Sequence, residues 1–312
     1  MINIHNRIAK KNLKVSFFDY WQVYIILLPS LLYLLIFNYI PIYGILLAFK
    51  DFRPRLGILW SEWVGLRHFR NFFSLNAFKT ILNNTIILSV YQLAAGFPLP
   101  IIFALALNSC ENKRFKKTVQ TITYAPHFIS IVVLVGMLNI LFSPSQGIVA
   151  NLLRMLGLYD QPILVLTDPK TFRHLYVWSG VWASLGWSSI IYLGALSAVD
   201  PELHESARVD GASKFQRIVY IDFPTILPTI VILLVLNCGG IMSVGFEKVF
   251  LLQKTLNINV SEVISTYVYK IGIRDGQFSL ATAVGLFNSG VNFVMLVLVN
   301  TLARRFSDYS LW

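Results

Sequence analysis

Long uncharged stretches divide this sequence and restrict what it can fold into. Five of them contain no Asp, Glu, Lys, Arg or His, and they span residues 20–49, 80–110, 175–199, 223–246 and 276–303. A sixth stretch, 118–153, contains a single ionisable side chain, His127. A helix needs about 20 apolar residues to cross a hydrocarbon core of about 30 Å, so each stretch is long enough to span a membrane.

The composition points in the same direction. Only 13% of the residues are charged and 56% are hydrophobic, whereas soluble domains carry about 25% charged residues. Too few charged side chains remain to cover a water-facing surface. We therefore predict an all-α, polytopic membrane protein with six transmembrane helices, and we disfavour a large soluble helical protein.

The predicted helices follow the uncharged stretches. We expect them at residues 24–49, 80–107, 122–142, 173–199, 224–245 and 279–303. Four prolines predict kinks or breaks in the first two helices; these are Pro29, Pro41, Pro98 and Pro100. No second soluble domain is indicated, so the expected organisation is a basic segment at 1–23 and one transmembrane domain at 24–312, with a polar loop at 200–222. Cys110 and Cys238 are far apart in the sequence and are expected to be free.

The segment before the first helix is polar and basic, and it does not have the pattern of a cleavable signal. Four cations at 7–14 are followed by Phe17, Phe18 and Trp21. Such a segment can lie in the membrane interface, with its cations at anionic headgroups and its rings in the acyl boundary. A positive flank that only sets the topology is an equally good interpretation.

The distribution of Lys and Arg leaves the orientation undecided. With a cytoplasmic N-terminus, 13 of these residues fall on the cytoplasmic side and 13 on the outer side. Cytoplasmic loops normally carry the excess. The inner segments are the shorter ones, and one of them places Lys113, Arg114, Lys116 and Lys117 beside a membrane end. This density favours a cytoplasmic N-terminus.

The polar segment between the predicted fourth and fifth helices has the pattern of a short amphipathic helix. Asp200 is a candidate N-cap, and Pro201 suits the first helical turn. Glu202 and Glu205 lie near the positive end of the helix dipole. Gly211 permits a left-handed turn before a second short helix at 214–220. A helical loop of this kind at the membrane face is suited to docking another protein.

The same segment resembles a known motif, the EAA loop of binding-protein-dependent ABC importer permeases. The resemblance rests on Glu205-Ser206-Ala207, Asp210-Gly211-Ala212, Ile221 and Pro224. In that family the loop is cytoplasmic and forms a coupling helix in a groove of the ATPase subunit. The resemblance implies a type I importer (MetI-like) fold with cytoplasmic N- and C-termini. Ser206 stands where the family usually has Ala, a small change that should leave docking intact. The residues given a coupling role are Glu202, Glu205, Ser206, Ala207, Asp210, Gly211 and Ala212.

Other segments resemble the carbohydrate, maltose-permease-like group of this family, and within it the YteP/LplB-like oligosaccharide permeases. These segments are 37–44, 48–52, 96–100, 124–130, 244–248 and 310–312. The resemblance implies a bacterial cytoplasmic-membrane protein that forms a heterodimer with a second homologous permease. It also implies two ATPase subunits, an extracytoplasmic solute-binding lipoprotein and an oligosaccharide cargo, but no nucleic-acid partner.

ATP hydrolysis is expected in another chain. The sequence has no GxxxxGK[ST] motif, whose backbone would cradle the phosphates. ATP and Mg²⁺ are therefore expected to bind to the partner ATPase subunits. This chain itself is not expected to be an enzyme. No pattern of metal ligands or catalytic residues is present either. His127 lies beside Pro126 near the start of the predicted third helix, and a hydrogen-bonded structural histidine is favoured over a proton relay.

A sugar pathway requires aromatic rings for stacking and amides or hydroxyls for hydrogen bonds. Candidates within the predicted helices are Trp178, Trp182, Trp187, Tyr192, Asn84, Gln92, Asn139, Asn237, Asn288 and Asn292. Polar groups in lipid are costly, so these amides should face the bundle or a cavity. The alternative remains open for each of them, because amides also join helices and tryptophans also anchor them at interfaces.

The outer loops carry 13 Lys and Arg against seven Asp and Glu, a net charge of +6. A positive vestibule attracts anions, which suggests an acidic oligosaccharide as cargo. Docking of an acidic face of the binding protein is the other interpretation.

The mechanism implied by the resemblance is alternating access. ATP-driven closure of the ATPase pair would be transmitted through 202–212 to the membrane helices. An ion-gradient-driven secondary sugar transporter is the main alternative, but it normally needs ionisable groups inside the membrane, and the predicted spans have no carboxylate. A membrane-bound transferase would likewise lack candidate acid or base groups.

Overall fold

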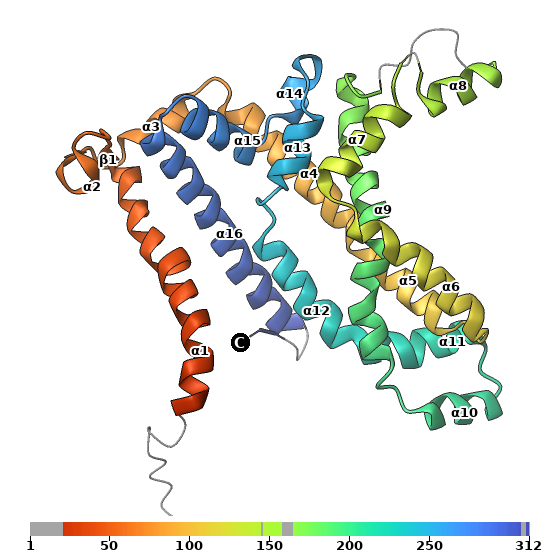
Figure 1. Ribbon diagram of the computed structural model, residues 1–312. Coiled ribbons are helices and arrows are strands. Elements are labelled where there is room, and N and C mark those ends of the chain that lie inside the picture. The colour runs from red at the N-terminus through yellow and green to blue at the C-terminus, as the bar shows by residue number, and fades with distance from the viewer. Residues whose placement is uncertain (1–20, 145, 158–164, 307–309, 312) are drawn as a thin grey trace, which may run out of the picture.

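The computed structural model describes residues 21–144, 146–157, 165–306 and 310–311. Long helices run from one end of the molecule to the other, and most of the short helices gather at the end opposite the C-terminus (Figure 1). In the described part of the chain, four helices are long and apolar enough to cross a membrane, and two bent helix pairs bring the number to six if each pair is one span. The four are Trp21–Phe49, Phe78–Asn108, Lys214–Gly239 and Phe278–Arg305.

The elements follow one another in this order. The first part of the chain contains α1 (Trp21–Leu34), η2 (Leu35–Tyr39), η3 (Ile40–Phe49), β1 (Lys50–Asp51), α2 (Gly57–Trp60), β2 (Glu62–Trp63), α3 (Arg67–Ser74), α4 (Phe78–Gly96), α5 (Pro98–Asn108), α6 (Lys113–Tyr124), η4 (Ala125–Phe128), α7 (Ile131–Leu141) and α8 (Ile148–Met155). The second part contains α9 (Pro169–Leu196), α10 (Pro201–Val209), α11 (Lys214–Arg217), η5 (Ile218–Asp222), α12 (Phe223–Gly239), α13 (Phe246–Leu252), η6 (Thr255–Asn257), α14 (Ile258–Ser261), α15 (Ile264–Tyr269), η7 (Lys270–Arg274) and α16 (Phe278–Phe306).

The first span is continuous, but its geometry changes along its length. The α-helix α1 contains Pro29 and passes into a π-helical turn, η2, and then into a 3-10 helix, η3, that has Pro41 near its start. A proline has no N–H to donate, so the regular hydrogen-bond ladder changes around it. Residues 21–43 are exposed along this span, and α1 stands apart from the other helices (Figure 1).

The second span also follows the proline pattern. The helices α4 and α5 are separated at Phe97, directly before Pro98. The predicted break therefore lies where the sequence placed it, and α5 begins with Pro98 in its first turn.

The prediction of one helix spanning 122–142 is wrong. The chain instead forms α6 and η4, and then turns by 100° into α7. Ser130 accepts a hydrogen bond from Val133 N at 3.3 Å and so caps a new helix. The cations at 113–117 lie in α6 rather than in a loop before the helix. His127 lies in η4, directly before the bend into α7.

The helix α9 connects most of the bundle. It contacts α4, α5, α6, α12, α13 and α14. Its first half packs in an apolar cluster with α7 and α13, and its second half packs with α5 and α12. Gly186 permits the contact with α6, because a Cβ there would lie 2.3 Å from the carbonyl oxygen of Thr123 and 2.8 Å from the Tyr124 ring.

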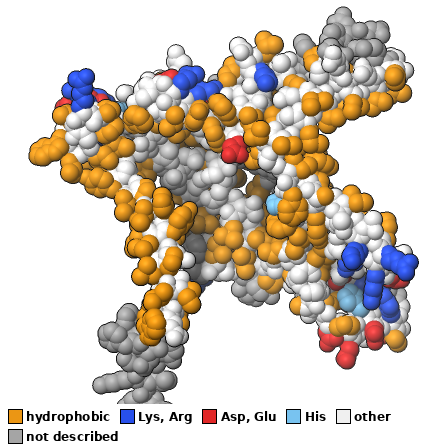
Figure 2. Space-filling view, in the orientation of Figure 1, with side chains coloured by type: hydrophobic (Ala, Val, Ile, Leu, Met, Phe, Trp, Pro, Cys, Tyr) orange, Lys and Arg blue, Asp and Glu red, His pale blue; other side chains and the backbone are white. Residues whose placement is uncertain are grey.

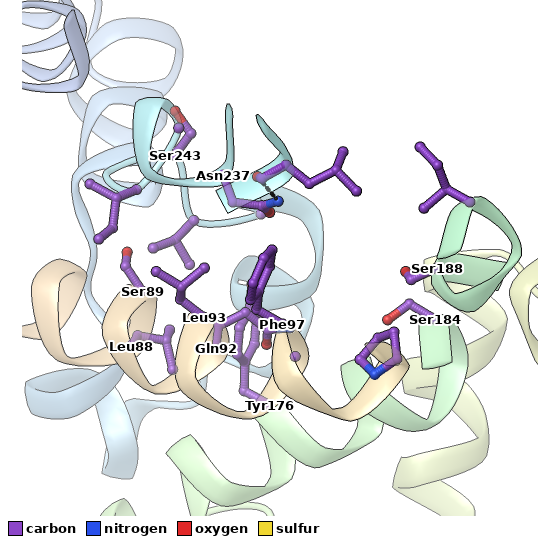
Figure 3. Close-up of a pocket in the computed structure, with 18 of the residues that line it drawn as sticks. Leu88, Ser89, Gln92, Leu93, Phe97, Tyr176, Ser184, Ser188, Asn237 and Ser243 are labelled. Carbon is purple, nitrogen blue, oxygen red and sulfur yellow. Dashed lines mark hydrogen bonds between the residues drawn. The ribbon is translucent and has the colours of Figure 1, made fainter. Parts of the chain in front are cut away.

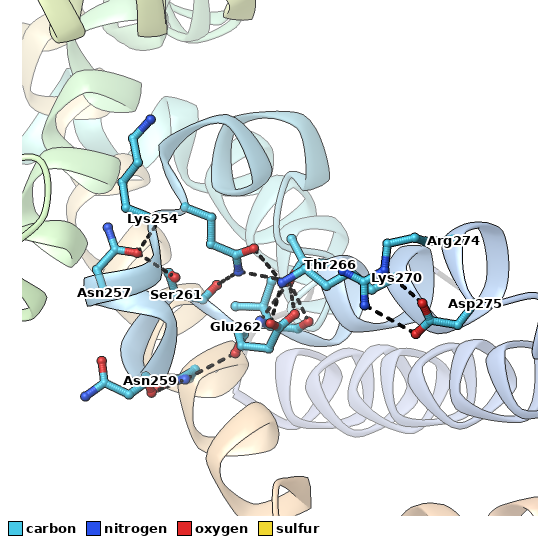
Figure 4. A network of polar contacts seen from close by, with 12 residues as sticks. Lys254, Asn257, Asn259, Ser261, Glu262, Thr266, Lys270, Arg274 and Asp275 are labelled. Atoms are coloured by element: carbon cyan, nitrogen blue, oxygen red, sulfur yellow. Dashed lines mark hydrogen bonds and ion pairs between the residues drawn. The ribbon is translucent and has the colours of Figure 1, made fainter.

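Polar side chains hold together the short helices at one end of the molecule (Figure 4). Lys270 Nζ lies 2.6 Å from Glu262 Oε2 and donates to Gln253 Oε1 at 2.8 Å. Asn84 on α4 donates to the carbonyl oxygens of Asn259 and Glu262, at 2.8 and 3.1 Å. The network thus fixes α14 and α15 on α4. The same end holds a two-stranded antiparallel ladder of β1 and β2, which was not predicted.

The start of α1, the α5–α6 turn, α10 and the C-terminus lie together at the opposite end (Figure 1). Apolar side chains cover α1 and much of the visible face, whereas Lys and Arg gather at the two ends (Figure 2). This arrangement places the start of the described chain, its end and the polar loop on one side, as expected. Cys110 and Cys238 are both free, as predicted. The basic segment at 7–14, with Phe17 and Phe18, lies outside the described residues.

The close contact at Gly186 gives a prediction about stability. Gly186→Ala should destabilise the folded protein by about 1–3 kcal/mol, since the new methyl group meets backbone that cannot move freely. Gly194→Ala is the matched control on the same helix, because nothing lies within 4 Å of a Cβ there. Thermal unfolding in detergent should show a lower midpoint for the first variant alone, and equal midpoints would contradict the proposed role of this contact.

Candidate functional site: a polar pocket and an exposed helical loop

A pocket with many polar groups lies between α4, α5, α9 and α12, and its volume is about 420 Å³. Its hydroxyl and amide groups come from Ser89, Gln92, Tyr176, Ser184, Ser188, Tyr192, Asn237 and Ser243. Figure 3 shows Ser184 and Ser188 on one side of the pocket, with Ser89 and Gln92 on the other. Such a concentration of polar groups inside an apolar bundle is typical of a cavity that receives a polar ligand.

The helix α9 supplies much of the wall. Tyr176, Ser184, Ser188 and Tyr192 line the pocket, and the last three are spaced by four residues, so neighbours in this series lie close together on the helix surface. Gly180 lies four residues after Tyr176 and four before Ser184. Because it has no side chain, the side chains of Gln92 and Lys248 come close to α9 at this position.

Three of the predicted pathway residues meet in this pocket: Gln92, Tyr192 and Asn237. They come from α4, α9 and α12, so they are far apart in the sequence. Asn237 Nδ2 donates to the carbonyl oxygen of Leu233 at 2.7 Å. The remaining predicted pathway residues lie outside the pocket.

Two of these amides join elements to one another. Asn84 is 3% exposed, and in addition to its bonds to α14 it accepts a hydrogen bond from Arg173 Nη2 at 3.0 Å. Asn292 accepts a bond from Met242 N at 2.8 Å and donates to Ser243 Oγ at 2.9 Å. The Oδ1 atom of Asn288 is buried, and the described residues offer it no hydrogen-bond partner.

The three tryptophans of α9 are about half exposed, and none of them lines the pocket. Trp178 Nε1 donates to Tyr91 Oη at 2.9 Å. Trp187 stacks on His127, with ring centres 4.3 Å apart. Trp182 is 50% exposed. Among the described residues, the His127 ring thus has aromatic contacts and not the hydrogen bond that was expected for it.

The loop after α9 has the local structure that its sequence predicts. Asp200 caps α10 by accepting from Glu202 N at 3.0 Å. Gly211 has φ +82, a left-handed conformation that glycine adopts without strain. Ala212 N donates to Ala207 O at 2.8 Å, which closes the C-terminus of α10 in a Schellman motif. The second short helix, α11, has Ser213 as its N-cap, which forms a capping box with Gln216, and it continues through η5 into α12.

The residues with a predicted coupling role lie on one exposed surface. Glu202, Glu205, Ser206, Asp210 and Gly211 are exposed, while Ala207 and Ala212 are half-buried. The same loop also exposes apolar side chains, with Val209 at 89% and Phe215 at 73%. A helical loop that exposes both carboxylates and apolar side chains can dock into a complementary groove.

Buried contacts tie this loop to the membrane helices, and the sequence did not predict them. Asp222 is 2% exposed, and its Oδ1 lies 3.3 Å from His204 Nε2 and 3.1 Å from Asn108 Nδ2. These atoms join α10, the start of α12 and the end of α5. Asp222 directly precedes an uncharged stretch, and this position is the signal that could have singled it out.

A second contact joins the loop to the α5–α6 turn. Lys214 Nζ lies 3.1 Å from Glu111 Oε1, and Arg208 lies 3.9 Å from the same atom. The hydrogen bond and the charge of Lys214 hold the pKa of Glu111 below its usual range. A cavity of about 500 Å³ lies between these groups and α10.

Comparison of this chain with known proteins identifies its family. Residues 96–308 match the family model of the binding-protein-dependent transport system inner membrane component. The chain belongs to this family. The matched range contains the pocket-lining parts of α9 and α12 and the whole exposed loop. The resemblance inferred from the EAA-like residues is thereby confirmed, and so is a multi-pass permease fold.

Two curated relatives are similar over nearly their whole length. The polygalacturonan/rhamnogalacturonan transport system permease protein YteP of Bacillus subtilis (strain 168) is 40% identical over 309 residues, which are 99% of this chain and 96% of the relative. Protein LplB of the same organism is 40% identical over 294 residues, 94% of this chain and 92% of the relative.

Two solved structures share the fold. One is the crystal structure of a bacterial ABC transporter involved in the import of the acidic polysaccharide alginate, which has a chain with 41% identity and a TM-score of 0.84 over 92% of this chain and 96% of that one. The other is a bacterial alginate ABC transporter in complex with alginate pentasaccharide-bound periplasmic protein, with 39% identity and a TM-score of 0.87 over 96% and 99%.

The chain's family is a membrane component of a transport system, which agrees with the absence of an ATP-binding motif in the sequence. Within the described ranges, no group of three or more His, Cys, Asp or Glu is placed to hold a metal ion.

The buried Asp222 contact gives a second prediction. Asp222→Ala should lower stability by about 1–3 kcal/mol, because His204 and Asn108 each lose an acceptor. Glu62→Ala removes an exposed carboxylate in β2 and should leave stability unchanged. Thermal unfolding of the two variants in detergent compares them directly. A loss of equal size in both would show that the Asp222 contact has no special role.

Proposed function

We propose that this chain is the permease subunit of an ATP-driven importer that carries an oligosaccharide into the cell. The observation that carries the proposal is the polar pocket inside the bundle, because a polar cavity among apolar helices suits a hydroxyl-rich cargo. Gln92, Tyr192 and Asn237 can hydrogen-bond sugar hydroxyls, and Tyr176, Phe97 and Tyr192 offer rings for the C–H faces of sugars. The names of the curated relatives and of the solved transporters support the carbohydrate class.

The exposed loop is the proposed docking site for an ATPase subunit. Its coupling surface consists of Glu202, Glu205, Ser206, Ala207, Asp210, Gly211 and Ala212. Exposed apolar residues beside these carboxylates, Val209 and Phe215 above all, would become buried in a groove of the ATPase. ATP and Mg²⁺ would be bound by two such ATPase subunits and not by this chain.

Movement of the docked loop would reach the pocket through buried contacts. His204 on α10 meets Asp222 at the start of α12, and Asp222 also meets Asn108 at the end of α5. Both α5 and α12 contribute walls of the pocket. Closure of the ATPase pair would therefore shift the two helices together and open the pocket alternately to each side of the membrane.

The remaining partners are a second permease and an extracytoplasmic solute-binding protein. The first span supports a second permease, since residues 21–43 are exposed and α1 stands apart from the bundle. Another transmembrane chain packed against α1 would complete the pore. We propose a heterodimer with both termini in the cytoplasm, the side on which α10 would meet the ATPase, and the binding protein on the opposite side.

The proposed cargo is acidic. The outer loops carry a net charge of +6, which concentrates anions at the entrance. A solved transporter that shares the fold imports the acidic polysaccharide alginate.

The pocket can be tested by filling it. Ser188→Phe should block most oligosaccharide uptake, because the ring would occupy the cavity, while the assembled complex should still hydrolyse ATP. Ile190→Phe is the control, since residues two apart on a helix face opposite sides and Ile190 is exposed outside the lining. Uptake is measured in proteoliposomes with the binding protein present. Normal uptake by the Ser188 variant would exclude this pocket from the pathway.

The coupling loop can be tested at Gly211. Gly211→Val should separate ATP hydrolysis from transport, because a β-branched residue is strained at φ +82. Gly211→Asn is the matched variant, since Asn tolerates the left-handed region and a Cβ there meets nothing within 4 Å. The readouts are co-purification of the ATPase and uptake per ATP hydrolysed.

The two Gly211 variants should differ. Retained coupling in the Val variant would argue against docking through this turn. A chain that purifies alone and transports sugar on an ion gradient would instead favour a secondary transporter.

A further inference from the structure

Lys248 is a buried lysine beside the polar pocket. It lies on α13, is 8% exposed, and its Nζ donates to the carbonyl oxygen of Tyr176 at 2.6 Å. The same Nζ lies 4.7 Å from the centre of the Tyr176 ring, and Tyr176 lines the pocket. An ammonium group has three N–H donors, so the bond to Tyr176 occupies one of them.

The ammonium group lies near Gly180, where it comes close to the pocket-lining residue Gln92. A Cβ on Gly180 would lie 3.0 Å from Lys248 Nζ and 3.5 Å from Gln92 Oε1. Lys248 and Gln92 thus converge on the space that a side chain at 180 would fill. Gly180 belongs to the α9 face that carries Tyr176 and Ser184, which are both in the lining.

No carboxylate in the described part of the chain balances this charge. The hydrogen-bond and ring contacts of Lys248 there are the Tyr176 carbonyl and the Tyr176 ring, and none of the ion pairs includes it. The neighbouring Glu247 is exposed, and adjacent residues on a helix point in different directions. A buried cation is costly unless it is paired, so a counter-ion from outside this chain would stabilise it.

A second polar group on the wall also lacks a partner. Ser89 is 8% exposed and lines the pocket, yet its Oγ has no hydrogen-bond partner among the described residues. Several other helical hydroxyls, such as Thr85 and Ser184, bond to a carbonyl one turn earlier. Ser89 lies on α4 one turn before Gln92, and Figure 3 shows both on the side of the pocket opposite Ser184 and Ser188. A buried hydroxyl without a partner is a free hydrogen-bonding group for a ligand.

We propose that Lys248 binds a carboxylate of the cargo, so that this pocket selects oligosaccharides that contain uronate units. This inference rests on the proposed function, because it assumes that the pocket receives the oligosaccharide. The carboxylate would accept charge-assisted bonds from Lys248 Nζ, and the Gln92 amide and Ser89 hydroxyl would bind neighbouring oxygens. Such bonds are strong in a site from which water is excluded. The positive outer loops would then concentrate acidic sugars, and Lys248 would discriminate among the sugars that enter.

The test compares a uronate trisaccharide with its methyl ester, which removes the negative charges and adds one methyl group to each carboxyl. Binding is measured on the purified transporter in nanodiscs, with its partner subunits and without the solute-binding protein, whose own selectivity would otherwise interfere. The unmodified transporter should bind the acid at least about tenfold more tightly than the ester. Lys248→Met should abolish this preference by weakening the acid alone.

Two further variants separate recognition from structure. Lys248→Gln keeps a donor for the Tyr176 carbonyl but has no charge, and it should lose the preference as Met does. Lys254→Met removes an exposed lysine from the same segment of the chain and should leave the preference unchanged. Assembly of all variants is checked by co-purification of the partner subunits.

The outcomes are distinct. An unchanged preference in Lys248→Met, an equal loss for both ligands, or full rescue by Gln would each overturn the role of Lys248 and leave the carbohydrate pocket standing. If neither ligand binds the unmodified transporter, and Ser188→Phe also leaves uptake intact, the proposed pathway itself fails, and this inference with it.

Discussion

A lipid bilayer offers no hydrogen-bond partner to a polar group, and this constraint organises the whole bundle. Most of its interior amides and hydroxyls are satisfied within the protein: Asn84 bonds to the backbone of α14, and Asn292 bonds to Met242 and Ser243. The polar pocket contains one of the exceptions. Among the described residues, Ser89 Oγ at its wall has no hydrogen-bond partner, and Lys248 beside it has one hydrogen bond and no carboxylate partner. Polar groups that lack partners inside an apolar bundle are the ones that a cargo can use.

The parts of the fold that depend on local sequence could be predicted. The spans follow directly from uncharged length, and the exposed loop follows from its caps, because Asp200, Pro201 and Gly211 act on their immediate neighbours. The break at Phe97 was equally visible in the prolines that follow it. These features need no knowledge of what packs against them.

Features that depend on tertiary contact were missed. The bend before α7 lies inside an apolar stretch that reads as one helix, although Pro126 and the capping Ser130 were signals of a break. The contact between His204 and Asp222 joins residues on different helices, so no local pattern indicates it. Lys248 was counted among the outer-loop charges, and only its contact with Tyr176 shows that it is buried. The amide side chains of the predicted helices could not be sorted for the same reason. The sequence does not distinguish an amide that lines a cavity, such as Gln92, from one that joins helices, such as Asn84.

The first and last spans pack against each other through η3 and α16, and one serine joins the last span to the residues that directly follow the first. Ser279 at the start of α16 donates to Lys50 O at 2.7 Å and accepts from Phe52 N at 3.0 Å, across sequence separations of 229 and 227 residues. During synthesis, the first span therefore enters the membrane long before its permanent neighbour in this chain exists. Its apolar, exposed surface allows it to remain surrounded by lipid during that interval. Assembly of the complete bundle must then wait for the last helix to leave the ribosome, so a truncated chain would keep an anchored but unjoined first helix.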